Sequence, residues 1–211
     1  MDKNTIDVLR NFSTINQSIM IYAGNQLATM ATTKNIFASA VVATEFPRDF
    51  AIYNLPEFLS VLSLFSEPKI EYGENDITIK EGKMKVRYQY SSPAVVVSPP
   101  KGKSIPVRDV LLTFDLKKED LAGLVKASSI LKATDLIIDQ NSMSVTNRKG
   151  NDNTYKIDIE AAEGDTDRSF ALKVEYLKLI PNDYRVQVNE RVLNFTNEEK
   201  QLSYTFTLDR D

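Results

Sequence analysis

Apolar and polar residues alternate strictly over residues 83–90, KMKVRYQY. A period of two predicts a strand with one buried face, and the same period returns 118 positions later, over residues 201–208, QLSYTFTL. The residues predicted to face inward are Met84, Val86, Tyr88, Tyr90, Leu202, Tyr204, Phe206 and Leu208. Two strands with one pattern suggest that a larger unit is repeated.

Other elements recur at nearly the same spacing. Predicted hairpins at 69–79 and 185–195 lie 116 positions apart, and short helical patterns at 55–64 and 173–180 each follow a strand that contains the pair Phe-Ala. Each half also opens with an amphipathic helix and then a strand, at 4–16 and 18–22 and at 117–131 and 134–139. The chain therefore reads as two copies of one unit, each with a helix, several antiparallel strands, a second helix and three more strands.

The segment between the two copies has a different character. Residues 91–109, SSPAVVVSPPKGKSIPVRD, hold four of the eight prolines, and prolines interrupt both helices and sheets. We therefore predict a first domain at 1–92, an extended connector at 93–109 and a second domain at 110–211.

Composition removes several classes of chemistry. The hydrophobic fraction of 42% and charged fraction of 26% are typical of a folded globular protein. The chain has no cysteine and no histidine, which excludes disulfides, thiolate nucleophiles, Cys/His zinc sites and a histidine base. No cofactor is expected. The lack of a long apolar run and of a signal-peptide pattern predicts a cytosolic protein without a membrane partner.

Positive charge is concentrated on the predicted helices of a chain whose net charge is -3. In the helix at 117–131, an apolar stripe of Leu121, Leu124, Val125, Ser128 and Leu131 has basic residues to one side of it. The eight helix cations are Lys3, Arg10, Lys117, Lys118, Lys126, Lys132, Lys173 and Lys178. Without them the chain has 18 basic and 29 acidic residues. These lysines either solvate helix surfaces or form a surface for a polyanion.

Four stretches carry a resemblance to a known family: VLRNFSTINQSIM at 8–20, DFAIYNLPEFLSVLSL at 49–64, KKEDLAGLVKASSIL at 117–131 and LKLIPNDYRVQV at 177–188. In these stretches the chain resembles the DNA polymerase sliding clamps of tailed bacteriophages, which are related to proliferating cell nuclear antigen. The resemblance implies an α+β fold of two clamp domains, with antiparallel sheets outside and helices lining a ring of three subunits. The uncharged exposed face of the helix at 55–64 departs from an evenly basic lining.

The same resemblance implies partners and sites. Duplex DNA would pass through the ring without base contacts, facing Lys118 and Lys126 and, less securely placed, the other helix cations. The replicative polymerase and the clamp loader would dock in an apolar pocket, with the transcription machinery as a further partner. Subunit joints would use strands near 84–90 and 167–173, and the protein would act in the cytoplasm of an infected bacterial host. The pocket would involve Val97, Ile105, Val107 and Leu208, although the apolar connector residues could equally anchor the connector to the sheet.

Two other functions compete with this interpretation. A metal-dependent nuclease or phosphatase would need converging carboxylates, for which Asp165 with Asp167, or Asp158 with Glu160, are the candidates. The first pair is more simply explained as a solvated turn, and the second fits the outer face of a strand. A phage structural or scaffold β-protein that assembles through sheet edges is the other alternative.

Overall fold

The computed structural model describes residues 1–150, 153–164 and 166–208. Contacts divide the chain into two compact units, Met1–Ser104 and Ile105 onward. The division falls within the predicted connector at 93–109, which contains a short 3-10 helix, η1 (Pro93–Val95), and no strand. No helix in the described part of the chain has the length and apolarity required to cross a membrane.

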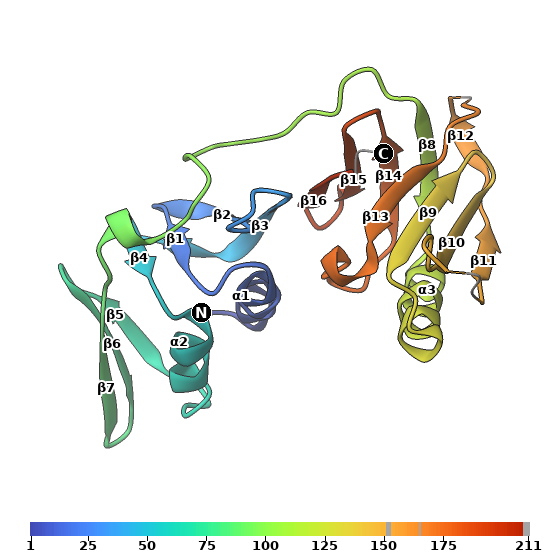
Figure 1. The fold of residues 1–211 in the computed structure, drawn as a ribbon. Coiled ribbons are helices and arrows are strands. Elements are labelled where there is room, and N and C mark those ends of the chain that lie inside the picture. Colours follow the sequence, from blue (N-terminus) through green and yellow to red (C-terminus); the bar gives the residue numbers. More distant parts are fainter. Residues whose placement is uncertain (151–152, 165, 209–211) are drawn as a thin grey trace. The chain divides into compact units, whose positions relative to one another are not determined.

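The first unit contains two α-helices and seven strands among its described residues (Figure 1). They are α1 (Lys3–Ile15), β1 (Ile19–Ile21), β2 (Gly24–Met30), β3 (Ile36–Phe46), β4 (Phe50–Ile52), α2 (Leu55–Leu62), β5 (Lys69–Tyr72), β6 (Asp76–Glu81) and β7 (Met84–Gln89). Antiparallel pairing joins β1 to β4, β2 to β3, and β5, β6 and β7 in that order. The predicted opening helix and the hairpin at 69–79 are confirmed.

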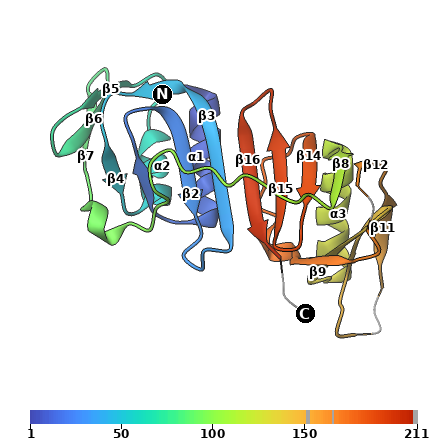
Figure 2. The ribbon, with the colours of Figure 1, turned by 90° about the horizontal axis from the view of Figure 1, so that it is seen from above.

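Helices α1 and α2 pack against each other in this unit (Figure 2). Leu9 and Phe12 of α1 are fully buried, as are Leu55 and Phe58 of α2. Both helices begin at a capping side chain, because Asp2 accepts a hydrogen bond from the backbone N–H of Thr5 and Asn54 accepts one from that of Glu57. The helix layer of the first unit is thus built by residues that the sequence pattern identifies.

The second unit has one α-helix among its described residues. Its elements are β8 (Leu112–Leu116), α3 (Lys118–Leu131), β9 (Asp135–Asp139), β10 (Ser142–Thr146), β11 (Tyr155–Asp158), β12 (Ala161–Glu163), β13 (Phe170–Lys173), the 3-10 helix η2 (Val174–Tyr176), β14 (Tyr184–Val188), β15 (Val192–Asn197) and β16 (Leu202–Thr207). One sheet has the order β11-β10-β9-β13, and the other contains β12, β8, β14, β15 and β16 as successive neighbours. Buried residues of β8, β14, β15 and β16 supply much of the core of this unit, and residues of β9, β10 and β13 add to it.

The prediction of a helix at 173–180 is wrong. Lys173 ends β13, and only the three residues of η2 follow as a 3-10 turn. Lys173 supplies no capping side-chain bond, whereas its counterpart Asn54 caps α2, and Pro56 occupies the first turn of that helix. Val174 and Tyr176 also favour extended structure over a helix. The repeat therefore holds for the opening helices and the later strands but not for the second helix.

Two details of predicted burial are also corrected. The sequence pattern assigns Val125 to the buried stripe of α3, but its side chain is 40% exposed, because it lies at the angular margin of the stripe formed by Leu121, Leu124 and Ser128. Met84 is 50% exposed because β7 is the last strand of its sheet. The inward faces predicted for 201–208 are confirmed, since Leu202, Tyr204, Phe206 and Leu208 are all buried.

Candidate nucleic-acid interface

Helix α3 and its two cap residues carry four of the predicted cations: Lys117, Lys118, Lys126 and Lys132. At about 100° per residue, Lys118 and Lys126 lie 80° apart on the exposed side of the helix, away from buried Leu124, and Lys132 is the residue that caps its C-terminus. All three lysines are exposed, and none has an ion pair among the described residues. Lys132 ends the helix in the left-handed conformation, with φ of 54°. This side of α3 therefore presents lysine side chains that form no ion pair among the described residues.

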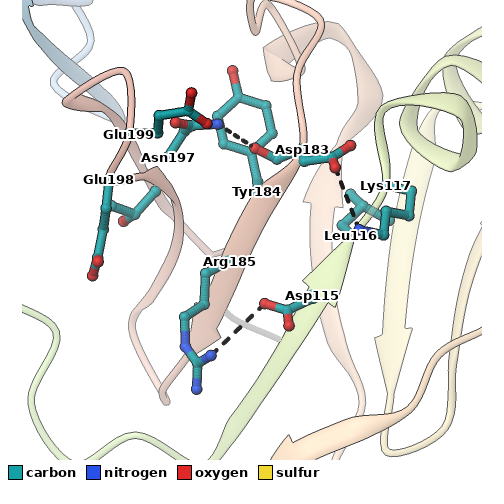
Figure 3. A pocket seen from close by; sticks show the side chains of 10 residues that line it. Asp115, Leu116, Lys117, Asp183, Tyr184, Arg185, Asn197, Glu198 and Glu199 are labelled. Carbon is teal, nitrogen blue, oxygen red and sulfur yellow. Dashed lines mark hydrogen bonds and ion pairs between the residues drawn. The ribbon is translucent and has the colours of Figure 1, made fainter.

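The start of α3 is held by an acid from a distant loop. Asp183 accepts a hydrogen bond of 2.8 Å from the backbone N–H of Lys118, and its other oxygen lies 3.3 Å from the Lys117 Nζ (Figure 3). The Lys118 bond, and then Lys117, lower the pKa of Asp183. Asp183 thus replaces the capping side chain that Lys117 cannot supply, and Lys117 shares its charge with an acid.

In α1 the two predicted cations differ. Lys3 is exposed in the first turn and has no ion pair among the described residues, whereas Arg10 pairs with Asp7 at 2.7 Å. Burial alone would raise the pKa of Asp2 beside this helix, but hydrogen bonds from Thr44 and Thr5 hold that pKa well below its usual range. The first unit consequently offers less unpaired positive charge on its opening helix than the second.

Lys173 forms an ion pair with a buried acidic residue. The Lys173 Nζ contacts Asp135, whose residue is only 2% exposed, and the Arg148 Nε lies 3.7 Å from the same carboxylate oxygen. Burial opposes ionisation of Asp135, but hydrogen bonds from Lys173, Thr134 and the Arg148 backbone lower its pKa. Lys178 follows η2 as an exposed residue. Neither Lys173 nor Lys178 lies on the helix that the sequence predicted.

A cavity of about 600 Å³ in the second unit lies beside the end of the connector. Ile105 is the one residue of the predicted partner pocket that lines it. Its walls are Ile105, Pro106, Arg108, Asp109, Leu111, Asn189, Glu190, Arg191 and Val192. The Asn189 side chain donates a hydrogen bond of 2.8 Å to the Arg108 carbonyl, which fixes the connector against the β14–β15 turn.

The other predicted pocket residues lie outside this lining. Val107 is half-buried and Leu208 is buried, with its backbone N–H bound to the Arg191 carbonyl. Val97 belongs to the first unit, where its carbonyl accepts a hydrogen bond of 2.9 Å from the Asn16 side chain. The structure therefore does not gather these four residues into one pocket within either unit.

The acidic pairs considered for metal binding do not converge among the described residues. Asp158 lies at the end of β11, Glu160 precedes β12, and Asp167 lies in the bend before β13. Asp165 lies outside the described residues. In the part of the chain that the structure covers, no group of three or more acidic side chains is arranged to hold a metal ion.

Comparison with known proteins assigns the chain to a family. The sliding clamp of Vibrio phage KVP40 is 32% identical over 198 residues, which covers 90% of this chain and 90% of that protein. This chain is a member of the sliding clamp family. The family described as DNA polymerase processivity factor also matches residues 2–98 of the clamp.

Solved structures agree with this assignment at the level of the fold. Proliferating cellular nuclear antigen from Entamoeba histolytica superimposes with a TM-score of 0.70 at 12% identity, covering 98% of the clamp and 95% of that chain. The beta clamp of Helicobacter pylori, solved with a DNA ligase peptide, has a TM-score of 0.67 at 15% identity and covers 99% of the clamp and 65% of that chain. The predicted α+β clamp fold is confirmed, and the clamp is a processivity factor of the phage DNA replication type.

Residues that the sequence alone did not indicate also shape the clamp. Asp183 lies 65 positions from the helix start that it caps, and no local pattern links the two. Arg108 and Arg191 line the connector cavity, although the sequence indicated only apolar residues there. The hairpin predicted at 185–195 was the one sequence feature that could have indicated this site, because its turn brings Asn189 to the connector.

Proposed function

We propose that the clamp encircles duplex DNA as a homotrimeric ring, tethers the replicative polymerase and has no catalytic activity of its own. The main supporting observation is that the Lys118 and Lys126 side chains of α3 are exposed and form no ion pair among the described residues. Lysine is a flexible point charge that attracts phosphate without reading base edges. A surface of this kind suits a protein that slides along DNA of any sequence.

The eight predicted DNA-facing cations contribute unequally in this proposal. Lys118, Lys126, Lys132 and Lys3 are the principal contacts, because each is exposed and unpaired among the described residues. Arg10 and Lys117 contribute less because each shares its charge with a nearby acid. Lys173 holds Asp135 and is assigned a structural role, and Lys178 is a secondary contact. The DNA-facing charge is thus centred on α3.

The polymerase and the clamp loader would use the connector cavity of the second unit, with the transcription machinery as a further user. Its volume of about 600 Å³ and its apolar members Ile105, Leu111 and Val192 suit the side chains of a docking peptide. Arg108 and Arg191 would pair with acidic residues of that peptide. The Helicobacter pylori clamp, which was solved with a ligase peptide, supports peptide docking as the mode of binding.

The ring would close through sheet edges, which otherwise leave backbone groups unpaired. The strands predicted for this role, near 84–90 and 167–173, correspond to β7 and β13, and both lie at an edge of their sheets. The two units are proposed as the two clamp domains, joined by the connector at 93–109, and three chains would supply the six domains of the ring. The host cytoplasm is the proposed location.

The decisive experiment measures polymerase processivity on a primed circular template with the variant Lys118→Glu/Lys126→Glu. We expect shorter products and a weaker dependence of processivity on salt concentration. Each reversed lysine should remove about one of the phosphate contacts that the clamp makes with DNA. The matched control is Lys34→Glu/Lys200→Glu, which changes net charge equally in exposed turns. Native mass measurement must show the same oligomeric state for the wild type, the α3 variant and the control. Unchanged processivity and salt dependence in the α3 variant would refute the assignment.

A further inference from the structure

The first half of the connector is held by the first unit. The Asn16 side chain, at the C-terminal cap of α1, donates hydrogen bonds of 2.9 Å to the carbonyls of Val97 and Met30. Its oxygen accepts from the backbone N–H and the hydroxyl of Ser18. Asn16 is only 7% exposed, and Pro99 is also buried. Because this buried amide uses both its donors and its acceptor oxygen, it fixes the start of the connector on the first unit.

Lys101 makes a second attachment to the same unit. Its Nζ lies 3.5 Å from the Asp49 carboxylate, between β3 and β4, and 5.3 Å from the centroid of the Tyr22 ring, between β1 and β2. Asp49 also accepts a hydrogen bond of 2.6 Å from the backbone N–H of Ala23, and this bond, and then Lys101, lower its pKa. An anion and an aromatic face both attract an ammonium group, so this site of the first unit favours Lys101.

A tight turn lets the Lys101 side chain reach this site. The Lys103 N–H donates to the Pro100 carbonyl at 3.1 Å, which closes a four-residue turn, and Gly102 has φ of 68°. A positive φ at the third position of such a turn favours glycine. The turn packs against β2 and leaves a cavity of only about 50 Å³ there. The connector therefore stays in contact with the first unit as far as Lys103.

The second half of the connector is held by the second unit, where the Arg108 carbonyl accepts from the Asn189 side chain. Residues 104–107 lie between the two attached halves and form no hydrogen bond within the described part of the chain. Two of them, Ile105 and Pro106, line the cavity of about 600 Å³. One wall of the proposed docking cavity is thus a short unbonded segment between two attachments.

The length of this segment depends on Lys101. Lys103 and Arg108 are five residues apart, and a fully extended chain of that length spans about 18 Å. If Lys101 is detached, the held part ends at Pro99, nine residues from Arg108, and the span rises to about 32 Å. The Lys101 side chain is 58% exposed, so its ion pair adds little stability and is readily reversible. A local change at Lys101 therefore alters how freely the cavity wall moves.

We propose that Lys101 is a positioning residue for partner docking, because its attachment to the first unit holds the cavity wall in place for the polymerase. The inference rests on the proposed docking of the polymerase at the connector cavity. Lys101 is not among the described residues that line this cavity, so it acts through the connector and not by contact. A partner that binds a detached wall must order a longer free segment, and this entropic cost rises with the logarithm of the segment length.

The test measures binding of the purified replicative polymerase to the full-length clamp by surface plasmon resonance, without DNA. Lys101→Ala should weaken binding about two- to threefold, since the free segment lengthens from five to nine residues. Lys101→Arg, which keeps a cation near Tyr22 and Asp49, should restore the wild-type affinity. Lys103→Ala is the matched control, because it removes an exposed positive charge that has no ion pair among the described residues.

A double-mutant cycle tests whether Lys101 acts through the first unit. Asp49→Asn keeps an oxygen for the Ala23 N–H but loses the negative charge that faces Lys101. It should weaken polymerase binding in the same direction as Lys101→Ala. The combined variant Lys101→Ala/Asp49→Asn should bind no more weakly than Lys101→Ala alone, since both changes break one contact.

A spin label reports the mobility of the connector directly. The chain has no cysteine, so Ser104→Cys supplies a single labelling site in the free segment. Electron paramagnetic resonance should show a more mobile label in the Lys101→Ala background, and wild-type mobility in the Lys101→Arg and Lys103→Ala backgrounds. A contribution of Lys101 to the stability of the first unit alone would leave the mobility of this label unchanged.

The outcomes separate the positioning role from the docking site. The inference is overturned if Lys101→Ala binds the polymerase like the wild type, if its effect adds to that of Asp49→Asn, or if the label is no more mobile. Ile105→Ser, which changes the cavity wall itself, should weaken binding in every background. A wild-type affinity of Ile105→Ser would instead overturn the proposed docking at this cavity, and the positioning role with it.

Discussion

The buried carboxylate of Asp135 offers a sharp test of how the second unit is held together. Its two oxygens face different donors: Oδ1 faces the cations of Lys173 and Arg148, and Oδ2 accepts hydrogen bonds from the Thr134 hydroxyl and the Arg148 backbone. An amide has only one acceptor oxygen. In Asp135→Asn, the NH₂ group must therefore face donors on one side, whichever way it is turned.

The expected cost of Asp135→Asn follows from these contacts. Loss of a charged hydrogen bond and of a second acceptor in a buried position should lower the free energy of unfolding by about 3 kcal/mol. Lys173 and Arg148 retain side-chain exposures of 34% and 35%, so water compensates part of the loss and keeps the cost below that of a fully buried pair. Urea denaturation followed by circular dichroism at pH 7 measures the difference.

The pH dependence supplies the second half of the test. Because the folded pKa of Asp135 lies below its ordinary value of 3.8, its stabilisation is present above that value and is lost as the pH falls through the folded pKa. The gap between wild type and Asp135→Asn should therefore narrow below about pH 4. Asp167→Asn, an exposed position, is the control. A gap below about 1 kcal/mol at pH 7, or one that stays constant down to about pH 3, would refute the reasoning.

Three further predictions concern other positions. Gly164→Ala should destabilise the second unit by more than about 2 kcal/mol in urea denaturation, because Gly164 has φ of 92° and an added Cβ would lie 2.2 Å from the Leu111 carbonyl oxygen; wild-type stability would contradict this. Asp2→Ala should cost about 1–2 kcal/mol in thermal unfolding, since it removes the α1 cap and the partner of Thr44, and Asp7→Ala is the exposed control. Lys173→Ala should lower stability and leave the salt dependence of processivity unchanged, whereas Lys126→Ala should do the reverse; equal effects on processivity would argue against separate roles.

Local sequence determined the elements whose signals are short in range. The alternation in 201–208 and the hairpins at 69–79 and 185–195 predict the strands that form, because a period of two specifies one buried face wherever a sheet has a core. The opening helices follow from their apolar stripes, and the order of residues along the chain is enough to show that lysine is concentrated on α3. These features depend on residues within one turn or one strand of each other.

Tertiary structure decided what each charged side chain does. Sequence placed Lys173 and Lys126 in one class, but the fold brings Asp135 to the first and no acid to the second among the described residues. It also brings Asp183 across 65 positions to cap α3, and it reduces the expected helix at 173–180 to the turn η2. The physical reason is that ion pairs and caps depend on distances through space, which the repeat pattern along the chain does not contain. The sequence by itself therefore determined the clamp fold and its basic helix, and only the folded chain determined which of the eight cations are held by acidic side chains.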